Sequence, residues 1–542
     1  MSDGRPTLVV CGQVLVAAEP AGAVLAEAVG ILDGRVTVTG SRAEVMAAAA
    51  PGARIIDAGT AAVVPGLHDF HIHLVGLART RSGVQLDGAA DGGELLHLIR
   101  TFYAARQADE WVTGRGWSDA ILASIEPDAL EAAVGDRPAF LSSHDGHSAW
   151  ASAAARRLAG LSARTADPPG GRIERRPDGA PSGILRETAL DLVAGLVPRA
   201  QGEALRPALE ATLAELRSYG LTGASEAGDY TDRNGIGADA NLGDSYSSLT
   251  DLADVLDGRF RMTLGIPVDA ITAAAARGLR TGAPLPGHRT MRFGWAKEYA
   301  DGAIGSGTAA LFQPRSCGDH DPGILRVQPD ELDSLFAAAR PAGIGLAIHA
   351  IGDRAAATVL DAVERAPKRL SGVPRDRMEH LQLLRPSDRA RLASLGVIAS
   401  IQPIHAAADR DLVEECWDGR QDDAYAWRGL VDAGALLAAG SDAPVESVNP
   451  WLGVFAARHR RLPTDGRDDW RPAQALGILE ALHAYTLGPA LARGVTDEGH
   501  LRPGARADLA VLNTELDELL SAEAAFGAIR AQTIIIDGSV MA

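Results

Sequence analysis

The chain has 542 residues, enough for a large core with more than one structural unit. It is 46% hydrophobic and 23% charged, a composition that excludes an intrinsically disordered protein. The formal net charge of −18 repels phosphate backbones, so we expect no nucleic acid as a partner.

The cysteines and the first residues of the chain bear on its compartment. Cys11, Cys317 and Cys416 lie far apart and without CxxC spacing, a pattern that indicates neither a disulfide framework nor a thiolate zinc site. The chain does not begin with a basic segment followed by a long apolar core. No later stretch approaches the roughly 18 uninterrupted apolar residues of a membrane span. We therefore expect a cytoplasmic protein without a membrane partner.

The two ends of the chain have the texture of a small sheet. Residues 1–64 contain short runs of β-branched residues between turn residues, and the same texture returns from about Ala507 to Ala542. Because chain termini commonly lie close together, both ends are expected in one structural unit. We assign residues 1–64 and 495–542 to a composite β-sandwich.

Residues 65–494 alternate apolar strand candidates with alanine-rich helical stretches. That alternation is typical of a parallel α/β barrel, and it predicts a (β/α)8 TIM-type barrel. The eight expected strands are residues 63–74, 221–227, 261–268, 291–302, 344–352, 376–384, 396–403 and 434–444. The interval of about 75–216 is too long for a strand-to-helix connection, so it is expected to form an inserted α/β module.

Six side chains form the candidate metal site. His71 and His73 are two apart on an expected strand, and a period of two places both imidazoles on the same face, where they can bind one metal ion. An HxH pair alone is a weak signal, but four further residues accompany it. Each falls near the carboxyl end of an expected strand, where barrel enzymes assemble their sites: Lys297, His349, His380 and Asp442.

Lysine is rare in this chain. Of the 52 basic residues only Lys297 and Lys368 are lysines, so arginine serves wherever a positive charge suffices. A lysine that remains is a candidate for chemistry that a guanidinium, always protonated, cannot perform. The alternative, that two lysines survived by chance, stays open.

Several motifs together resemble a known family. The runs PGLHDFHIHL, ADGAIGS, HAIGDRA, RMEHLQLL, SIQPIHA, AGSDAPVESVNP and HLRPGARADLAVL, in this order, resemble the amidohydrolase superfamily. The closer resemblance is to the amidohydrolase-3 branch, which includes N-substituted formamide deformylases, and WVTGRGWSDA and DGHSAW belong to it as well. It extends from about residue 7 to the C-terminus. His68, in a slot that is usually apolar, and SEAG, in place of a more usual His-Asp pair, depart from the pattern and point to a changed substrate preference.

The resemblance implies a role for each of the six residues. His71 and His73 would bind the more buried metal and His349 and His380 a second one. Lys297, carboxylated by carbon dioxide, would bridge them. Asp442 would bind the first metal and act as general base and then general acid, while hydroxide generated at the metal attacks the carbonyl carbon. The implied ion is a divalent metal, zinc by expectation, with one or two ions per chain.

Simpler interpretations stand beside these roles. Lys297 is equally an ordinary buried lysine paired with Glu298 or Asp301, which would leave one metal. For Asp442 the alternative is a cap of the turn before Ala443 and Pro444, because SDAP is also plain turn chemistry, but the four converging histidines favour ligation of a metal.

Four residues outside the metal set are candidates for the substrate pocket. We expect substrate contacts from Trp117, His144, His147 and Glu298. For His144, His147 and His405 the alternative is a structural histidine, and for Trp117 it is the core of the insert.

The sequence thus predicts a metal-dependent amidohydrolase that cleaves an amide-type C–N bond, other than a peptide bond, of an N-acyl, N-formyl or carbamate substrate. One alternative is a mononuclear deaminase of a cyclic amidine. The other is a non-catalytic binding protein, which the presence of all the expected ligands disfavours. The partner is a small-molecule substrate, and a homodimer is the default expectation for the assembly.

Overall fold

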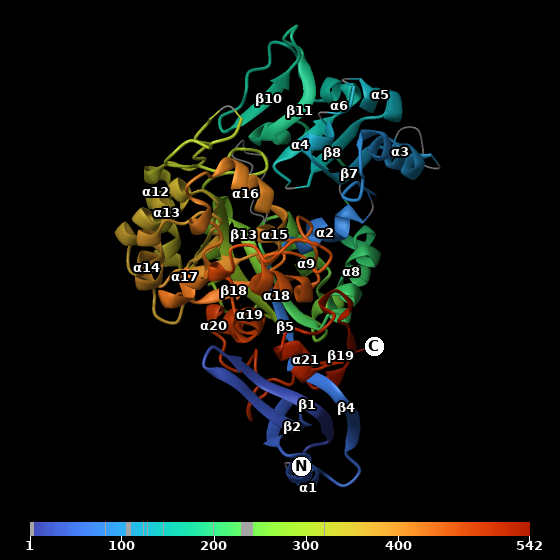
Figure 1. Cartoon of the computed structure of the whole chain (residues 1–542), viewed down its shortest axis with the longest axis vertical. Helices are drawn as coiled ribbons and strands as arrows, with labels where there is room; N and C mark the ends of the chain where they lie inside the picture. Colours follow the sequence, from blue (N-terminus) through green and yellow to red (C-terminus); the bar gives the residue numbers. More distant parts are fainter. Residues whose placement is uncertain are drawn as a thin grey trace.

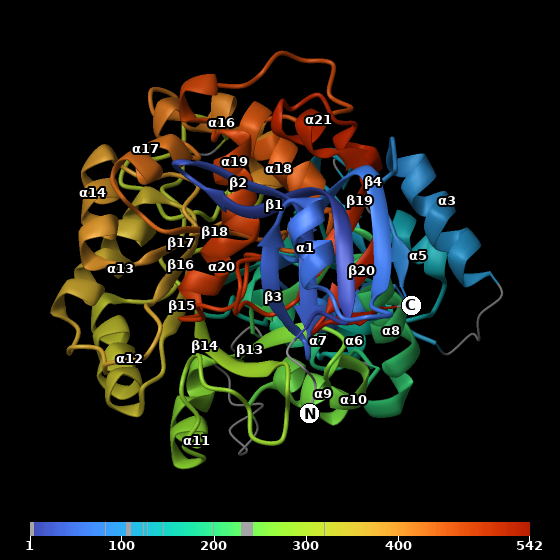
Figure 2. The same cartoon turned by 90° about the horizontal axis from the view of Figure 1, so that it is seen from below.

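The structure is a computed structural model that describes residues 5–541 except 82, 105–109, 123, 127, 145, 199, 229–241 and 319. Three parts follow one another along its longest axis (Figure 1). A sheet built from both ends of the chain lies at one end, the barrel occupies the middle, and the insert lies at the other end. Seen from below, the terminal sheet lies across the base of the barrel (Figure 2).

The central sheet confirms the predicted barrel. Its neighbouring strands are parallel and follow the chain order, and each overlaps one of the eight expected strands. They are β5 (Leu67–Ile72), β12 (Leu221–Glu226), β13 (Arg261–Pro267), β14 (Met291–Tyr299), β15 (Leu346–Ala350), β16 (Arg377–His380), β17 (Ile398–Ile401) and β18 (Leu437–Ala439). The ring is closed just beyond β18, where Asp442 N donates to His71 O at 2.7 Å and His73 N donates to Ala443 O at 2.8 Å.

Helices surround the barrel on its outer side (Figure 1). In α13 (Asp353–Arg365) the buried residues Ala356, Val359, Leu360 and Ala362 recur at intervals of three and four, as expected for a helix with one face on a core. Other helices of this layer are α2 (Leu74–Thr80), α8 (Arg206–Ser218), α12 (Pro329–Ala342), α14 (Pro386–Leu395), α17 (Trp427–Asp432) and α18 (Pro450–His459). A separate apolar cluster of Phe70, Trp295, Ala347, Ile398, Ala438 and Ala492 fills the barrel below the carboxyl ends of its strands. That cluster forms the floor of the candidate site.

The insert has a sheet and a core of its own. Its six strands, in the order β10-β11-β9-β8-β7-β6, span Val84 to Glu187. They are β6 (Val84–Gln85), β7 (Val112–Trp117), β8 (Ala139–Ser143), β9 (Ser148–Ala151), β10 (Gly171–Arg175) and β11 (Pro181–Glu187). The chain leaves the barrel through α2 and returns through α8, and these two helices pack against each other. All six strands fall inside the interval of about 75–216 that the sequence analysis assigned to an insert.

Strands from both ends of the chain pair in one sheet. Its order is β21-β20-β19-β4-β1-β2-β3, with β1 to β4 from the first 65 residues and β19 to β21 from the last 34. The hydrogen bonds join these strands into a single seven-stranded sheet, not the two separate sheets of a sandwich. They are β1 (Leu8–Glu19), β2 (Gly22–Leu32), β3 (Arg35–Gly40), β4 (Arg54–Pro65), β19 (Leu509–Glu515), β20 (Ala531–Ile536) and β21 (Ser539–Val540). Buried Arg261, at the start of β13, donates to Asp508 at 3.0 Å and so fastens the barrel to this sheet.

One disulfide corrects the interpretation of the cysteines. Cys317 and Cys416 are bonded across 99 residues of sequence, and Cys11 is a buried free thiol. The spacing gave no sign of the pair because the fold, not the sequence, brings the two residues together. Within the described residues, no helix combines the length and the apolar character that a membrane span requires.

Candidate metal centre

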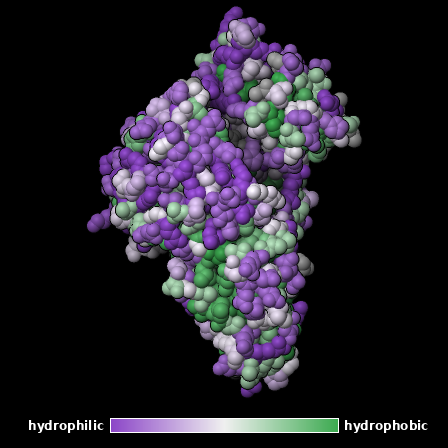
Figure 3. Space-filling view, viewed as in Figure 1, coloured by the Kyte–Doolittle hydropathy of each residue, from purple (hydrophilic) through white to green (hydrophobic). Residues whose placement is uncertain are grey.

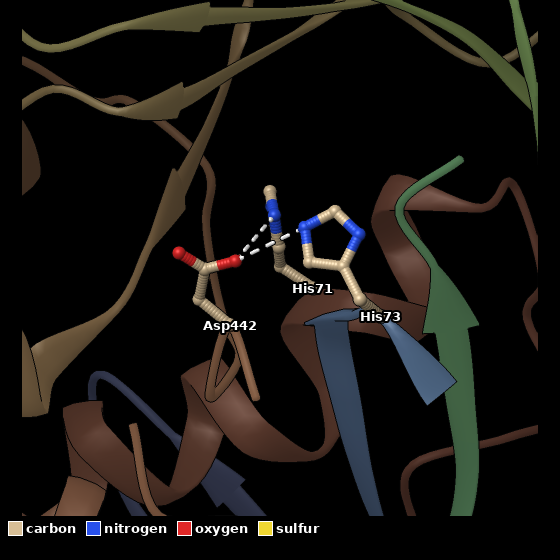
Figure 4. A group of neighbouring side chains, drawn as sticks. All are labelled: His71, His73 and Asp442. Carbon is tan, nitrogen blue, oxygen red and sulfur yellow. Dashed lines mark ion pairs between the residues drawn. The ribbon is translucent and has the colours of Figure 1, made fainter. Parts of the chain in front are cut away.

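His71, His73 and Asp442 meet at the carboxyl end of the barrel, as the sequence predicts. His71 lies near the end of β5, His73 is the N-cap residue of α2, and Asp442 lies in the turn after β18. One carboxylate oxygen of Asp442 faces both rings (Figure 4), at 3.1 Å from Nε2 of His71 and 3.3 Å from Nε2 of His73. The three residues can therefore share one ion.

Local backbone contacts hold these side chains in place. The buried Asp69 carboxylate accepts hydrogen bonds from the backbone N–H groups of His71 at 3.1 Å and Ser441 at 3.0 Å. Burial raises the pKa of Asp69 to about 7. Gly440 lies against the backbone of His71, where a Cβ atom would collide with it. Asp442 itself has a φ of 59°, a conformation that non-glycine residues adopt rarely and that Asp tolerates better than most.

A carboxylate lies behind His71. Glu379, the residue before His380, contacts Nδ1 of His71, and Arg377 donates to the same carboxylate at 3.0 Å. Arg377 also lies over the Phe70 ring, 4.1 Å from its centroid. Burial favours the protonated carboxyl, but Arg377 and His71 outweigh it and hold the pKa of Glu379 well below its usual range. A carboxylate at Nδ1 fixes the neutral tautomer that presents the Nε2 lone pair to an ion.

His349 and His380 form the second pair. Their ring centroids are 4.5 Å apart, and the ring of His380 is 5.2 Å from that of His71. Nε2 of His349 lies 3.0 Å from Gly302 O, which leaves Nδ1 as the lone-pair atom. Burial holds the pKa of both histidines well below the usual value, so both are neutral, as metal binding requires. The sequence-predicted ligands from β15 and β16 are thus adjacent to those from β5.

Lys297 is buried among these groups. Its side chain is 1% exposed on β14, and Nζ has no hydrogen-bond partner within the described residues. Burial lowers its pKa to about 8, although Glu379 and Asp442 oppose the shift. The two carboxylates of the simpler interpretation have backbone partners: Glu298 accepts from Tyr299 N at 2.8 Å, and Asp301 accepts from three backbone N–H groups.

His405 is a functional candidate that sequence reasoning placed outside the metal set. It lies in α15 (Pro403–Ala408), and its Nε2 is 3.2 Å from the second carboxylate oxygen of Asp442. Glu446 lies behind it, 3.6 Å from Nδ1. Asp442 therefore lies between two histidines that are each backed by a carboxylate, Glu379 for His71 and Glu446 for His405. Two sequence signals pointed to His405: its position just after an expected strand and its place in the motif SIQPIHA.

The insert brings further side chains to the site. His144 lies 2.7 Å from Asp87 within the insert and 3.5 Å from Glu446 of the barrel. The His147 ring is 5.6 Å from that of His349, and its Nδ1 is 3.1 Å from Glu187. Trp117 is fully buried in the core of the insert and donates to Leu141 O at 2.7 Å. This position matches the alternative role given for Trp117, a core residue of the insert.

The residues present fit a divalent ion. Two groups, His71 with His73 and Asp442, and His380 with His405 and Asp442, each offer three ligand atoms within 4.8 Å of one another. Within the described residues, His71 Nε2, His380 Nδ1 and Lys297 Nζ are buried without a hydrogen-bond partner. Buried polar atoms of this kind are costly unless a ligand satisfies them. Imidazole and carboxylate donors suit zinc and similar ions.

The chain is similar to known amidohydrolases. A profile described as the amidohydrolase family matches residues 54–542. The chain is 29% identical to the putative amidohydrolase YtcJ of Bacillus subtilis (strain 168), over 90% of each chain. It is also 29% identical to the N-substituted formamide deformylase of Arthrobacter pascens, again over 90% of each.

A solved structure also covers nearly the whole chain. An uncharacterized metal-dependent hydrolase from Pyrococcus furiosus superposes with a TM-score of 0.69 at 25% identity, over 92% of this chain and 97% of that one. An uncharacterized metal-dependent hydrolase from Pyrococcus horikoshii OT3 has a TM-score of 0.73 at 24% identity, over 96% of this chain and 99% of that one, and shows the same fold.

Proposed function

The chain belongs to the amidohydrolase family, and we propose from this membership and from the site that it hydrolyses an amide-type C–N bond of an N-acyl, N-formyl or carbamate substrate. The formamide deformylase relative, at 29% identity over 90% of each chain, supports this substrate class. The observation that carries the proposal is the position of Asp442, whose carboxylate contacts His71, His73 and His405 at the carboxyl end of the barrel.

The proposed ligand set divides between two ions, zinc by preference. His71, His73 and Asp442 would hold the first, and His349 and His380 the second. Lys297 would join them as a carbamate, because its burial among these residues lowers its pKa to about 8 and so favours the neutral amine that reacts with carbon dioxide. When bound, divalent ions acidify water to a pKa of about 7 and polarise the scissile carbonyl.

Asp442 is the proposed proton carrier. The neighbouring histidines hold the pKa of its carboxyl well below the usual range despite the burial that would raise it, so the group is available as a base. It would accept a proton from the attacking water and deliver it to the departing nitrogen, which places base and acid roles on one carboxylate.

The insert is proposed to enclose the substrate. The face seen in Figure 3 is hollowed between the barrel and the insert, and His144 and His147 lie on the insert's side of the site. With Glu298 of the barrel they remain proposed substrate contacts. An enclosed site strengthens every electrostatic interaction within it by excluding water.

A panel of N-formyl and N-acyl amines tests the reaction. The expected result is release of the free amine and the acid, lost in Asp442→Asn. Release of ammonia from a cyclic amidine, with no cleavage of the acyl amines, would overturn the proposal in favour of a deaminase.

A further inference from the structure

A disulfide joins two segments at the carboxyl end of the barrel. Cys317 lies in the connection between β14 and α12, whose described residues form neither helix nor strand between Tyr299 and Pro329. Cys416 is the last residue of α16 (Arg410–Cys416), which follows β17 and α15. Figure 1 places α16 on the side of the barrel that faces the insert. The bond thus ties together connections that follow two different barrel strands.

Each of the two cysteines lies in a chain segment that also contributes to the candidate site or contacts the insert beside it. Upstream of Cys416, Val413 N donates to Asp409 O at 2.9 Å and Asp409 N donates to His405 O at 2.8 Å, so α16 continues directly from the helix that carries His405. Upstream of Cys317, Thr308 donates to Glu187 of the insert at 2.6 Å. The same connection begins two residues after Lys297, at the end of β14.

The connection faces the insert across a cavity of about 50 Å³. Six residues of the connection line this cavity, and we call them its tip: Ser306, Gly307, Thr308, Arg315, Asp321 and Ile324. Arg172, Arg186 and Glu187 line it from the insert. Arg315 lies two residues before Cys317, so the disulfide fixes the part of the connection that meets the insert.

Weaker bonds accompany the disulfide. Ser316 N donates to Cys416 O at 2.9 Å, its hydroxyl donates to Glu415 O at 2.8 Å, and Arg420 donates to Gln313 O at 3.0 Å. The last two of these bonds lie at exposed positions, where water competes for them. A cross-link between distant residues restricts the chain far more than such bonds do.

Cys317 is the more exposed cysteine of the pair. Cys317 is partly buried between the exposed residues Ser316 and Gly318, whereas Cys416 is 6% exposed. We propose that Cys317 and Cys416 form a redox-sensitive clasp that holds the tip of this connection against α16, and that a dithiol reductant opens it. The effect on hydrolysis rests on the proposed function, whereas the opening itself does not.

The chemistry is a two-electron thiol-disulfide exchange. A thiolate of the dithiol attacks Cys317 Sγ, the S–S bond breaks, and Cys416 leaves as a thiolate that takes up a proton. The second thiol of the reductant, once deprotonated, attacks the reductant's sulfur atom in the mixed disulfide with Cys317. Cys317 is then released as a thiol, and the reductant leaves as a cyclic disulfide.

The test uses the full chain purified without reductant, then treated or not with dithiothreitol. Thiol titration of the unfolded protein should find one reactive thiol, that of Cys11, before treatment and three after it. Trypsin should cut after Arg315 about tenfold faster in the reduced protein, because cleavage follows the population of the open tip. The value of kcat/KM should fall on reduction.

Two variants complete the design. In the Cys317→Ser/Cys416→Ser double variant, cleavage after Arg315 should be fast and kcat/KM low, with no further change on adding dithiothreitol. Cys11→Ser should respond as the unmodified chain does. Three thiols before reduction, or equal cleavage rates in the oxidised and reduced forms, would overturn the clasp. A chain that hydrolyses none of the tested amides would refute the proposed function while thiol count and cleavage still decide the clasp.

Discussion

Glu379 contacts Nδ1 of His71 on one side of the imidazole ring, and Asp442 lies 3.1 Å from Nε2 on the other. The ring therefore has one orientation and one tautomer, with its lone pair directed at the position where a ligand would bind. Arg377 keeps Glu379 ionised and in place through a hydrogen bond of 3.0 Å.

Glu379→Gln should weaken metal binding. The amide cannot accept the Nδ1 proton as strongly as the carboxylate, so the ring loses its fixed tautomer, and we expect a loss of about 10- to 100-fold in metal affinity or activity. Competition with a chelator of known affinity measures it. The control is Glu364→Gln, an exposed carboxylate paired with Arg391 on the outer helices. Equal metal affinity in the two variants would contradict the role of Glu379.

Asp442→Asn should reduce turnover by about 10²- to 10⁴-fold, the usual contribution of a positioned acid or base. The amide keeps the shape of the side chain but carries no proton between water and the leaving nitrogen. Steady-state kinetics on the best acyl amine of the panel measures the change, with the metal content of the same sample determined in parallel. A variant that retains its ions and turns over at the original rate would show that the proton is carried elsewhere.

The Lys297→Arg variant distinguishes a site that holds two ions from a site that holds one. Arginine keeps the charge but forms no carbamate, so the metal content should fall from two ions to at most one, and kcat/KM should fall by about 10³-fold for the several kcal/mol that an ion supplies. Lys297→Ala should recover part of its activity with added propionate, which can occupy the vacated space as a carboxylate. Full activity in Lys297→Arg would contradict the bridged site and favour the mononuclear alternative.

The pairing of His144 predicts a pH-dependent stability. Hydrogen bonds to Asp87 and Glu446 raise the pKa of His144 to about 10, above its ordinary value of 6.5. Protonated His144 therefore stabilises the fold fully below its unfolded pKa, and the contribution is lost as the pH rises through about 10. The melting temperature of the unmodified chain should fall more between neutral pH and pH 10.5 than that of His144→Gln.

The matched control for this measurement is His97→Gln, an exposed histidine in α3 (Gly92–Tyr103) of the same insert. It should show the same dependence of melting temperature on pH as the unmodified chain. Because the His144 side chain is 41% exposed, solvent screening will make the effect modest. Identical pH dependence in all three proteins would exclude a stabilising pair between His144 and Glu446.

The sequence predicted the barrel because its strands are apolar on both faces and alternate with amphipathic helices. His71 was found through its spacing from His73, and Lys297, His349, His380 and Asp442 because each lies near the carboxyl end of such a strand, where the barrel fold leaves side chains at one rim. Sequence reasoning missed Glu379 as a partner of His71, because a charged residue beside His380 gives no sign that it is buried across the barrel.

Contacts between distant segments account for the other differences. His405 was placed outside the metal set because only the fold brings α15 to the turn that carries Asp442. Trp117 was offered for the pocket, but burial in the insert depends on packing that its local sequence does not reveal. The disulfide depends in the same way on the fold, which brings together two cysteines 99 residues apart.

Elemental analysis of the purified protein, combined with activity before and after chelation, tests most directly whether divalent ions at these residues carry out the hydrolysis. We predict two ions per chain, loss of amide hydrolysis when they are removed, and recovery on adding zinc, together with a native mass higher by one carbon dioxide at Lys297. Undiminished hydrolysis by protein shown to be free of metal would contradict this account.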